Sequence, residues 1–192
     1  MHKNRIEAFS DGVMAIILTI MVLEMKVPHG DASLSALKPI IPVFLSYVLS
    51  FVYLGIYWNN HHHLLQAANK VNGKILWANL HLLFWLSLLP FVTGWMGENG
   101  FAARPVLVYN LVLLMAGTAY YILSRTLVRH HGEDSDLSRA VGKDIKGVVS
   151  LIAYLVAVAL SFVNAWVAIT ISVAVALLWV IPDRRIESVI KD

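Results

Sequence analysis

The fold of this chain is decided by residues 5–26, which read RIEAFSDGVMAIILTIMVLEMK. Residues 12–23 are apolar and long enough to cross much of a bilayer, yet Asp11 precedes them and Glu24 follows them. Ionisable side chains at membrane depth are costly, so they tend to face protein or water and to mark function. We therefore predict that this segment is a transmembrane helix with the functional role, and that the rest of the chain positions it.

The composition is that of an integral membrane protein. Of the 192 residues, 58% are hydrophobic and only 14% are charged, and the mean hydropathy is +0.69. A soluble domain of this size is far more polar. The first segment does not read as a cleaved signal peptide, because acid and base are mixed at its start and no small-residue cleavage site follows. The formal charge of +3 comes from dispersed basic residues, so we expect no nucleic-acid partner.

Polar residues divide the chain into six apolar segments, each near the roughly 20 residues that a transmembrane helix needs. The expected helices cover about 4–26, 41–67, 74–95 and 104–129, with a fifth from about 147 and a sixth that ends near 182. Asn164 and Ala165 alone interrupt the last pair, which predicts a tight hairpin of slightly short spans. Residues 130–146 form the one long polar loop. We predict an all-α integral membrane bundle of six transmembrane helices in one domain, residues 1–192.

The basic residues predict the orientation of this bundle, because lysine and arginine are enriched in cytoplasmic loops. With the N-terminus inside, three of the fifteen basic residues are external: Lys26, Lys38 and Arg104. The cytoplasmic residues are then Lys3, Arg5, Lys70, Lys74, Arg125, Arg129, Arg139, Lys143, Lys146, Arg184, Arg185 and Lys191. Both termini are therefore expected in the cytoplasm, which agrees with an even number of helices.

The period of the first helix separates two kinds of side chain. At about 100° per residue one stripe runs along the helix, and it consists of Phe9, Gly12, Ile16, Thr19, Ile20 and Leu23. Asp11 lies about 140° from Ile16, on the opposite side. The carboxylate and the stripe cannot both face the same partner. If the stripe lines a pore, Asp11 points back into its own subunit.

Three polar clusters are expected at one depth of the membrane. Asp11 lies roughly two turns in from the cytoplasmic side, the second helix returns there with YWNNHHH at residues 57–63, and the third leaves with Asn79 and His81. A buried Asp with Arg5, an indole donor and imidazoles can satisfy its charge through hydrogen bonds. These groups form either a polar network that fixes helix packing or a proton relay. We favour the network, because intramembrane polar groups pair wherever they can.

Neither a metal site nor an enzyme is expected. The consecutive histidines His61, His62 and His63 point about 100° apart on a helix, so at most two of them can reach one ion. The absence of cysteine excludes thiolate metal sites. No HExxH, GxSxG or P-loop motif is present, and the external loops are too short to hold an active site.

The stripe itself has two interpretations. Ile16, Ile20 and Leu23 at helical spacing are ordinarily residues that face lipid or the core. Thr19 within the stripe and Glu24 at its external end favour another role. Several copies of this helix around an axis would give rings of branched side chains, a ring of hydroxyls and an acidic mouth. That pattern is typical of a hydrophobic constriction that gates by dewetting, with a vestibule that attracts cations.

Specific motifs carry a family resemblance. Residues 5–11, RIEAFSD, match an RxxxFSD signature at the start of a first transmembrane helix, and the continuation GVMAIILT and the run WNNHH at residues 58–62 accompany it. On these motifs the chain resembles a prokaryotic member of the transmembrane protein 175 family. This family comprises endosomal and lysosomal potassium channels and their single-repeat bacterial relatives.

The resemblance implies a homotetramer of six-helix subunits in a prokaryotic cell membrane, with the first helix around a central potassium pathway. By position it implies that Ile16 forms the narrowest part, with Ile20 and Leu23 above it, and that Thr19 takes part in selectivity. The family lacks the TVGYG filter, and this sequence contains none. Met14, a flexible residue just inside the expected constriction, is a departure to note.

The resemblance also implies that polar contacts of the signature hold the first helix against the second. The residues assigned to this network are Arg5, Phe9, Ser10, Asp11, Trp58, His61 or His62, and His81 at the same depth. Their expected role is structural, which agrees with the geometric argument that turns Asp11 away from the pore.

The sequence thus predicts a weakly to moderately selective potassium channel whose partners are further copies of itself, the lipid bilayer and monovalent cations. No cofactor is expected beyond the permeating potassium. An alternative is a proton-coupled transporter or proton channel that uses Asp11, His62 and His81 as a relay, although no broken helices or inverted repeats are evident. A third possibility is a membrane scaffold without transport activity, which would be favoured by a monomeric protein.

Overall fold

The computed structural model describes residues 3–30, 32–68, 70–132, 135–142 and 144–180, and every regular element in these ranges is a helix. The elements are α1 (Asn4–Leu23), the 3-10 helix η1 (Leu34–Ile40), α2 (Ile41–Gln66), α3 (Gly73–Ser87), α4 (Leu89–Glu98), α5 (Ala103–His131), α6 (Asp136–Val141), α7 (Ile145–Ser161) and α8 (Ala165–Val180). The prediction of an all-α fold is confirmed. The expected end of the last helix near 182 and the basic residues Lys143, Arg184, Arg185 and Lys191 lie outside the described residues.

Among the described residues, four segments are long and apolar enough to cross a bilayer. They are α1, η1 with α2, α3 with α4, and α5. The helices α7 and α8 are apolar but have only 17 and 16 residues. At about 1.5 Å per residue each spans roughly 25 Å, slightly less than the hydrocarbon core of about 30 Å. The count of six spans therefore stays a prediction.

The third expected helix, 74–95, is divided into α3 and α4 at Leu88. Pro90 is the second residue of α4 and has no N–H for the carbonyl four residues earlier, and its ring crowds that turn. The first helix ends at Leu23, before the expected 26. The short helix α6 lies within the expected polar loop.

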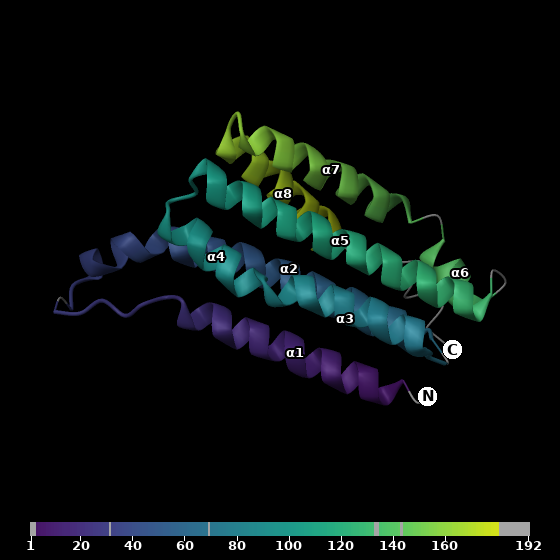
Figure 1. Ribbon diagram of the computed structural model, residues 1–192. Helices are drawn as coiled ribbons and strands as arrows, with labels where there is room; N and C mark the ends of the chain where they lie inside the picture. Colours follow the sequence, from purple (N-terminus) through teal and green to yellow (C-terminus); the bar gives the residue numbers. More distant parts are fainter. Residues whose placement is uncertain (1–2, 31, 69, 133–134, 143, 181–192) are drawn as a thin grey trace.

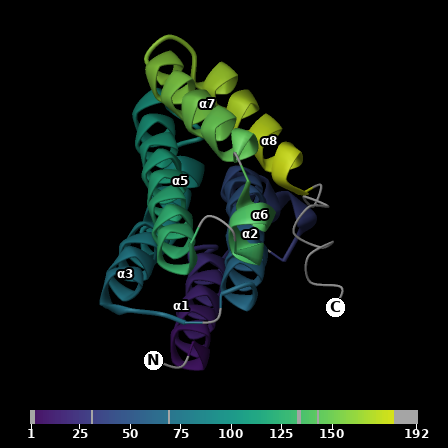
Figure 2. The same cartoon turned by 90° about the vertical axis from the view of Figure 1, so that its right-hand side faces the viewer.

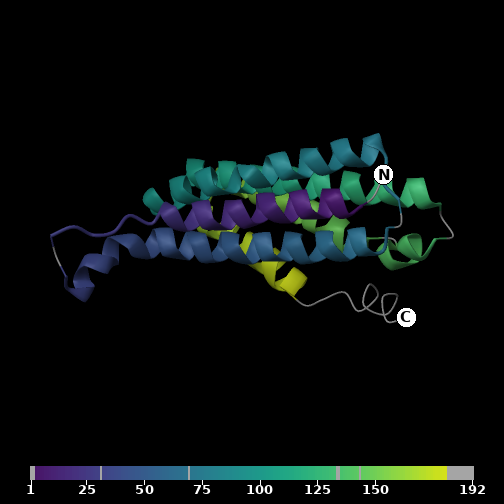
Figure 3. The same cartoon turned by 90° about the horizontal axis from the view of Figure 1, so that it is seen from below.

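The helices form an elongated bundle with α1 on one face and the α7–α8 hairpin on the opposite face (Figures 1 and 2). α1 packs against α2, α3 and α4, and Figure 3 shows it lengthwise between α2 and α3. α5 contacts α3, α4, α7 and α8, so it is the centre of the bundle. The bundle covers α1 from one side only: 28% of its apolar stretch is buried, against 50% for Gly73–Glu98.

Buried polar side chains connect the helices behind α1. The hydroxyl of Ser50 lies 2.6 Å from that of Thr93 and 3.1 Å from that of Tyr109, which links α2, α4 and α5. Ser172 of α8 donates a hydrogen bond to the side-chain oxygen of Asn110 at 2.5 Å. Such interhelical hydrogen bonds stabilise bundles in lipid, where apolar contacts alone give little drive for association. They stabilise the packing of the helices behind α1.

Candidate functional site

α1 has one buried side and one exposed side. Ile6, Ser10, Met14, Ile17 and Met21 are buried against the bundle. The exposed stripe consists of the residues that the helical period groups together: Phe9, Gly12, Ile16, Thr19, Ile20 and Leu23. The exposed fraction is 59% at Ile16 and 77% at Leu23. The stripe therefore faces away from its own subunit, toward lipid or another protein.

The polarity of the stripe is concentrated at Thr19. Its hydroxyl donates a hydrogen bond of 2.8 Å to the carbonyl of Ile16, one turn earlier, so the lone pairs of the exposed hydroxyl oxygen remain available as acceptors. Met14, by contrast, is only 2% exposed and packs in the core. The flexible methionine thus lies on the buried side of α1 and does not share the direction of the stripe.

Asp11 contacts the second helix through Trp58. The indole Nε1 of Trp58 donates a hydrogen bond of 3.0 Å to Oδ1 of Asp11, and the imidazole of His62 stacks on the same indole with ring centroids 6.1 Å apart. Asp11 remains exposed, and Trp58 is 48% exposed. A carboxylate about two turns inside the membrane is costly if it faces lipid. This part of α1 is therefore suited to contact protein or water.

The buried polar connection is made by Ser10, which lies beside Asp11 in the chain. The amide nitrogen of Asn79 on α3 donates to Oγ of Ser10 at 2.9 Å, and the amide oxygen of Asn79 lies 2.7 Å from Nε2 of His61 on α2. All three side chains are buried. The chain of contacts joins α1, α2 and α3. The sequence predicted the depth of Asn79 but not its partners. The feature that indicated a buried polar contact was an amide side chain in an otherwise apolar stretch.

Two residues assigned to the network lie apart from it. His81 accepts a hydrogen bond of 3.0 Å from Nε1 of Trp85, one turn further along α3, and forms no hydrogen bond, ion pair or ring contact with Asp11. Arg5 is exposed and makes no hydrogen bond or ion pair with the residues that the structure describes. Asp11 and His62 thus meet at Trp58, whereas His81 is not brought to them.

Glu24 lies beside a groove at the other end of α1. The groove has a volume of about 390 Å³. It is lined by Ile20 of α1, by Glu24 just after that helix, and by Ser87, Pro90, Phe91, Gly94, Trp95 and Glu98. Glu98 forms an ion pair of 3.3 Å with Lys26. A β-carbon at Gly94 would lie 3.4 Å from a carboxylate oxygen of Glu24, so glycine there lets the carboxylate lie close to α4. The groove carries two carboxylates, and the amine of Lys26, which does not line it, pairs with one of them.

No group of three or more histidine or acidic side chains is placed to hold a metal ion in the part of the chain that the structure describes. The histidines instead form hydrogen bonds or aromatic contacts, as at His61, His62 and His81. The site therefore offers exposed apolar surface, one hydroxyl and carboxylates rather than a ligand set for a metal.

Comparisons with known proteins agree on one family. Residues 5–90 match the family model of the endosomal/lysosomal potassium channel TMEM175. A potassium channel from Chryseobacterium sp. (strain P1-3) is 54% identical over 192 residues, which is the full length of both chains. The endosomal/lysosomal proton channel TMEM175 of Mus musculus is 28% identical over 150 residues, 69% of this chain and 30% of that protein.

A solved structure has the same fold. The crystal structure of a lysosomal potassium-selective channel TMEM175 homolog from Chamaesiphon minutus superposes with a TM-score of 0.81. The alignment covers 95% of this chain and 97% of that one, at 28% sequence identity. The likeness extends over the whole bundle, including the α7–α8 hairpin that the family model does not reach.

Proposed function

We propose a function for this chain from the premise that it belongs to the family of the endosomal/lysosomal potassium channel TMEM175. Its relative from Chryseobacterium is named a potassium channel, and the channel from Chamaesiphon minutus is described as potassium-selective. We infer that this chain conducts potassium across a prokaryotic cell membrane as a homotetramer. Its termini lie in the cytoplasm, and copies of α1 surround the ion pathway.

The exposed stripe of α1 is the observation that carries this proposal. Ile16, Ile20 and Leu23 project away from the subunit, and rings of such side chains form a constriction that closes by dewetting. Lipid alone would also accept these three residues. The exposed carboxylate of Asp11 on the same helix favours assembly, because contact with another subunit or with water removes the cost of placing it in lipid.

Two polar groups on α1 complete the proposed pathway. Thr19 presents its hydroxyl oxygen between Ile16 and Ile20, and a ring of such oxygens can replace water around a permeating cation and so favour one ion over another. Glu24 lies where the stripe ends, and its carboxylate raises the local concentration of cations at the mouth. No TVGYG filter is required in this arrangement.

The polar contacts between α1 and its neighbours have a positioning role in this proposal. Ser10, Asn79 and His61 hold α1 against α2 and α3 from the buried side. Trp58 holds Asp11 at the edge of the exposed face. Because α1 is held at both places, contacts within one subunit fix the direction in which Ile16 projects.

The test replaces Ile16 and a matched residue by asparagine. Ile152 is 57% exposed, close to the 59% of Ile16, and belongs to α7, the helix on the opposite face of the bundle from α1. Potassium and sodium fluxes are measured in liposomes with a proton ionophore present. We expect Ile16→Asn to raise potassium flux and to lower the preference for potassium over sodium, because a hydrated ring replaces an apolar one. Ile152→Asn is expected to leave both unchanged.

If Ile16→Asn and Ile152→Asn give the same potassium and sodium fluxes, Ile16 does not line the ion pathway. A purified protein that stays monomeric under crosslinking in membranes would instead favour a scaffold without transport activity.

A proton channel is the second candidate, because the mouse relative is named a proton channel. Asp11 and His62 lie on either side of Trp58, so protons would have to enter through water at that exposed edge. The same liposomes distinguish the two functions. Potassium flux that persists when the proton gradient is collapsed supports the potassium channel, and flux that disappears with the gradient supports proton coupling.

A further inference from the structure

The 3-10 helix η1 presents two exposed leucines at one end of the bundle. Leu34 is 85% exposed and Leu37 is 48% exposed. Among the residues that the structure describes, η1 has its main helix contacts with α2, which it precedes in the chain. Figures 1 and 3 show η1 beyond the last turn of α1. Exposed apolar side chains that lie together mark a contact with a membrane or with another protein.

The period of a 3-10 helix separates the side chains of η1 into two ridges. Three residues make one turn, so side chains at i and i+3 lie above one another. Leu34, Leu37 and Ile40 therefore form an apolar ridge, and Ser35 and Lys38 form a polar ridge about 120° away. Lys38 is exposed and makes no hydrogen bond or ion pair with the residues that the structure describes. η1 is therefore amphipathic.

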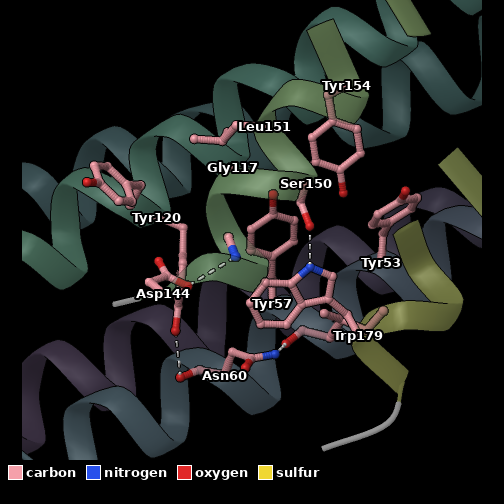
Figure 4. Close-up of a pocket in the computed structure, with 13 residues that line it drawn as sticks. Tyr53, Tyr57, Asn60, Gly117, Tyr120, Asp144, Ser150, Leu151, Tyr154 and Trp179 are labelled. Atoms are coloured by element: carbon pink, nitrogen blue, oxygen red, sulfur yellow. Dashed lines mark hydrogen bonds between the residues drawn. The ribbon is translucent and has the colours of Figure 1, made fainter. Parts of the chain in front are cut away.

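The depth of η1 in the membrane is measured from the end of the bundle that carries the N-terminus. A cavity bounded by α2, α5, α7 and α8 has Tyr57, Asn60, Asp144 and Trp179 in its walls (Figure 4). Asp144 is the N-cap of α7, and the amine of Lys146 lies 5.2 Å from the ring centroid of Trp179. Tryptophan and charged side chains gather at the membrane–water interface. One boundary of the hydrocarbon core therefore lies near Asn60 on α2 and near the start of α7.

The lengths of α2 and α7 give the other boundary. Residues 41–58 of α2 carry no charged side chain, and they rise about 27 Å at 1.5 Å per residue. α7 has 17 residues and rises about 25 Å before the hairpin turns. Both lengths approach the hydrocarbon core of about 30 Å. η1 directly precedes residue 41, so it lies where the hydrocarbon ends, at the level of the headgroups in the leaflet opposite the N-terminus.

We propose that η1 anchors the chain to the headgroup region of this leaflet. The apolar ridge lies at the boundary between headgroups and acyl chains, and the ammonium of Lys38 lies at the lipid phosphates. A lipid surface offers both kinds of partner within a few ångströms of each other, which is why amphipathic helices lie at this level of a membrane. The long stem of a lysine lets its charge reach the phosphates while the apolar ridge stays deeper.

The exposed side of α2 favours lipid over a second copy of the chain. Ile41, Phe44 and Val48 are exposed at helical spacing, so the apolar ridge of η1 continues into an apolar side of the span. A second copy would have to offer Lys38 a carboxylate as well. The described carboxylates at this end of the bundle are Glu24 and Glu98, which lie in the groove beside α4, where Lys26 already pairs with Glu98.

The absence of cysteine from the chain allows a nitroxide spin label to be attached at one chosen residue. Leu37→Cys places the label on the apolar ridge. Ser35→Cys is the matched control, because Ser35 is exposed on the same helix but belongs to the polar ridge. Leu34→Cys repeats the test on the apolar ridge and replaces Leu37→Cys if that variant fails to fold. A label at the exposed Arg129, at the other end of the bundle, gives the value for water.

The labelled full-length proteins are reconstituted in liposomes of phosphatidylcholine and phosphatidylglycerol. Electron paramagnetic resonance then measures collisions of the label with oxygen, which enters lipid, and with a nickel chelate, which stays in water. We expect the labels at Leu37 and Leu34 to be accessible to oxygen and to lie about 5–10 Å deeper than the label at Ser35. Equal access of nickel to Leu37 and Ser35 would overturn the proposal. Shielding of Leu37 from both reagents would also overturn it, because protein would then cover the ridge.

A second arm tests the contact between Lys38 and the phosphates with the label kept at Leu37. Lys38→Glu is expected to move the label toward water, because a carboxylate is repelled by phosphates, and Lys38→Arg is expected to leave its depth unchanged. An unchanged depth in Lys38→Glu would overturn the assignment of Lys38 to the phosphates. The readout is the depth of a label and not an ion flux, so the result is independent of the proposed channel function.

Discussion

Trp58 donates its indole N–H to the carboxylate of Asp11 across 3.0 Å, and this hydrogen bond joins α1 to α2. Both residues keep exposed surface in the isolated subunit. The bond therefore holds a carboxylate at the surface of the bundle, outside its core.

Asp11→Ala is expected to reduce assembly more than selectivity, because it removes a positioning contact and not a group of the pathway. The oligomeric fraction is measured by crosslinking in membranes, and the ratio of potassium to sodium flux is measured in liposomes. Trp58→Phe should reduce assembly as well, and the double variant should be no worse than Asp11→Ala, since the two residues share one interaction. Normal oligomers with lost selectivity would place Asp11 in the pathway instead.

Asn79→Ala is expected to destabilise the subunit by about 1–2 kcal/mol, because it leaves the buried side chains of Ser10 and His61 without their shared partner. The measurement is unfolding in detergent. Asn59→Ala is the control, since Asn59 is exposed on α2 and surface changes of this kind usually alter stability by less than about 0.5 kcal/mol. A similar loss in both variants would argue that the connection through Asn79 contributes nothing specific.

Gly97→Ala is expected to destabilise the packing of α4 on α2. A β-carbon at Gly97 would lie 2.6 Å from the Cα of Val43 and 2.5 Å from the hydroxyl of Ser46, so backbone must move to accept it. Overpacking of this kind costs about 1–3 kcal/mol. Gly55→Ala has the same chemistry without the contact and should change the free energy of unfolding little. Equal stability of the two variants would show that α4 can shift freely.

Glu24→Gln is expected to lower potassium conductance by about twofold at low salt and to have no effect near 1 M salt. The Debye length falls from about 30 Å at 0.01 M to about 3 Å at 1 M, so a carboxylate at the mouth attracts cations only in dilute solution. Lys26→Gln removes a positive charge from the same region and should raise conductance at low salt. If the effect of Glu24→Gln is independent of salt, Glu24 acts by contact with the ion or by packing.

Several features were predictable because they depend on one helix at a time. The apolar lengths predicted helices, and the helical period predicted that Phe9, Gly12, Ile16, Thr19, Ile20 and Leu23 share a side, which is the side that the structure leaves exposed. The family also followed from local motifs, and its assignment is confirmed. The break between α3 and α4 was missed, although Pro90 was its signal.

Features that join helices were predicted less well. Asp11, Trp58, His61, His62 and His81 were placed at one depth, but depth does not state which side chains face one another. His81 turns to Trp85 on its own helix, and Ser10 rather than Asp11 makes the buried contact with α3. The cavity around Tyr57 gathers residues from four helices, and no spacing along the chain indicates it.

The sequence by itself determined that this chain is a membrane protein built from helices, which side of α1 carries the branched residues, and to which family it belongs. Lipid solvation and the 3.6-residue period act on each segment separately, so these properties can be read from one segment. Only the tertiary structure decided that Asn79 links Ser10 to His61, that Trp58 holds Asp11, and that a cavity opens between α2 and α7. These contacts depend on the rotation and shift of whole helices against one another, which close packing of all side chains sets together.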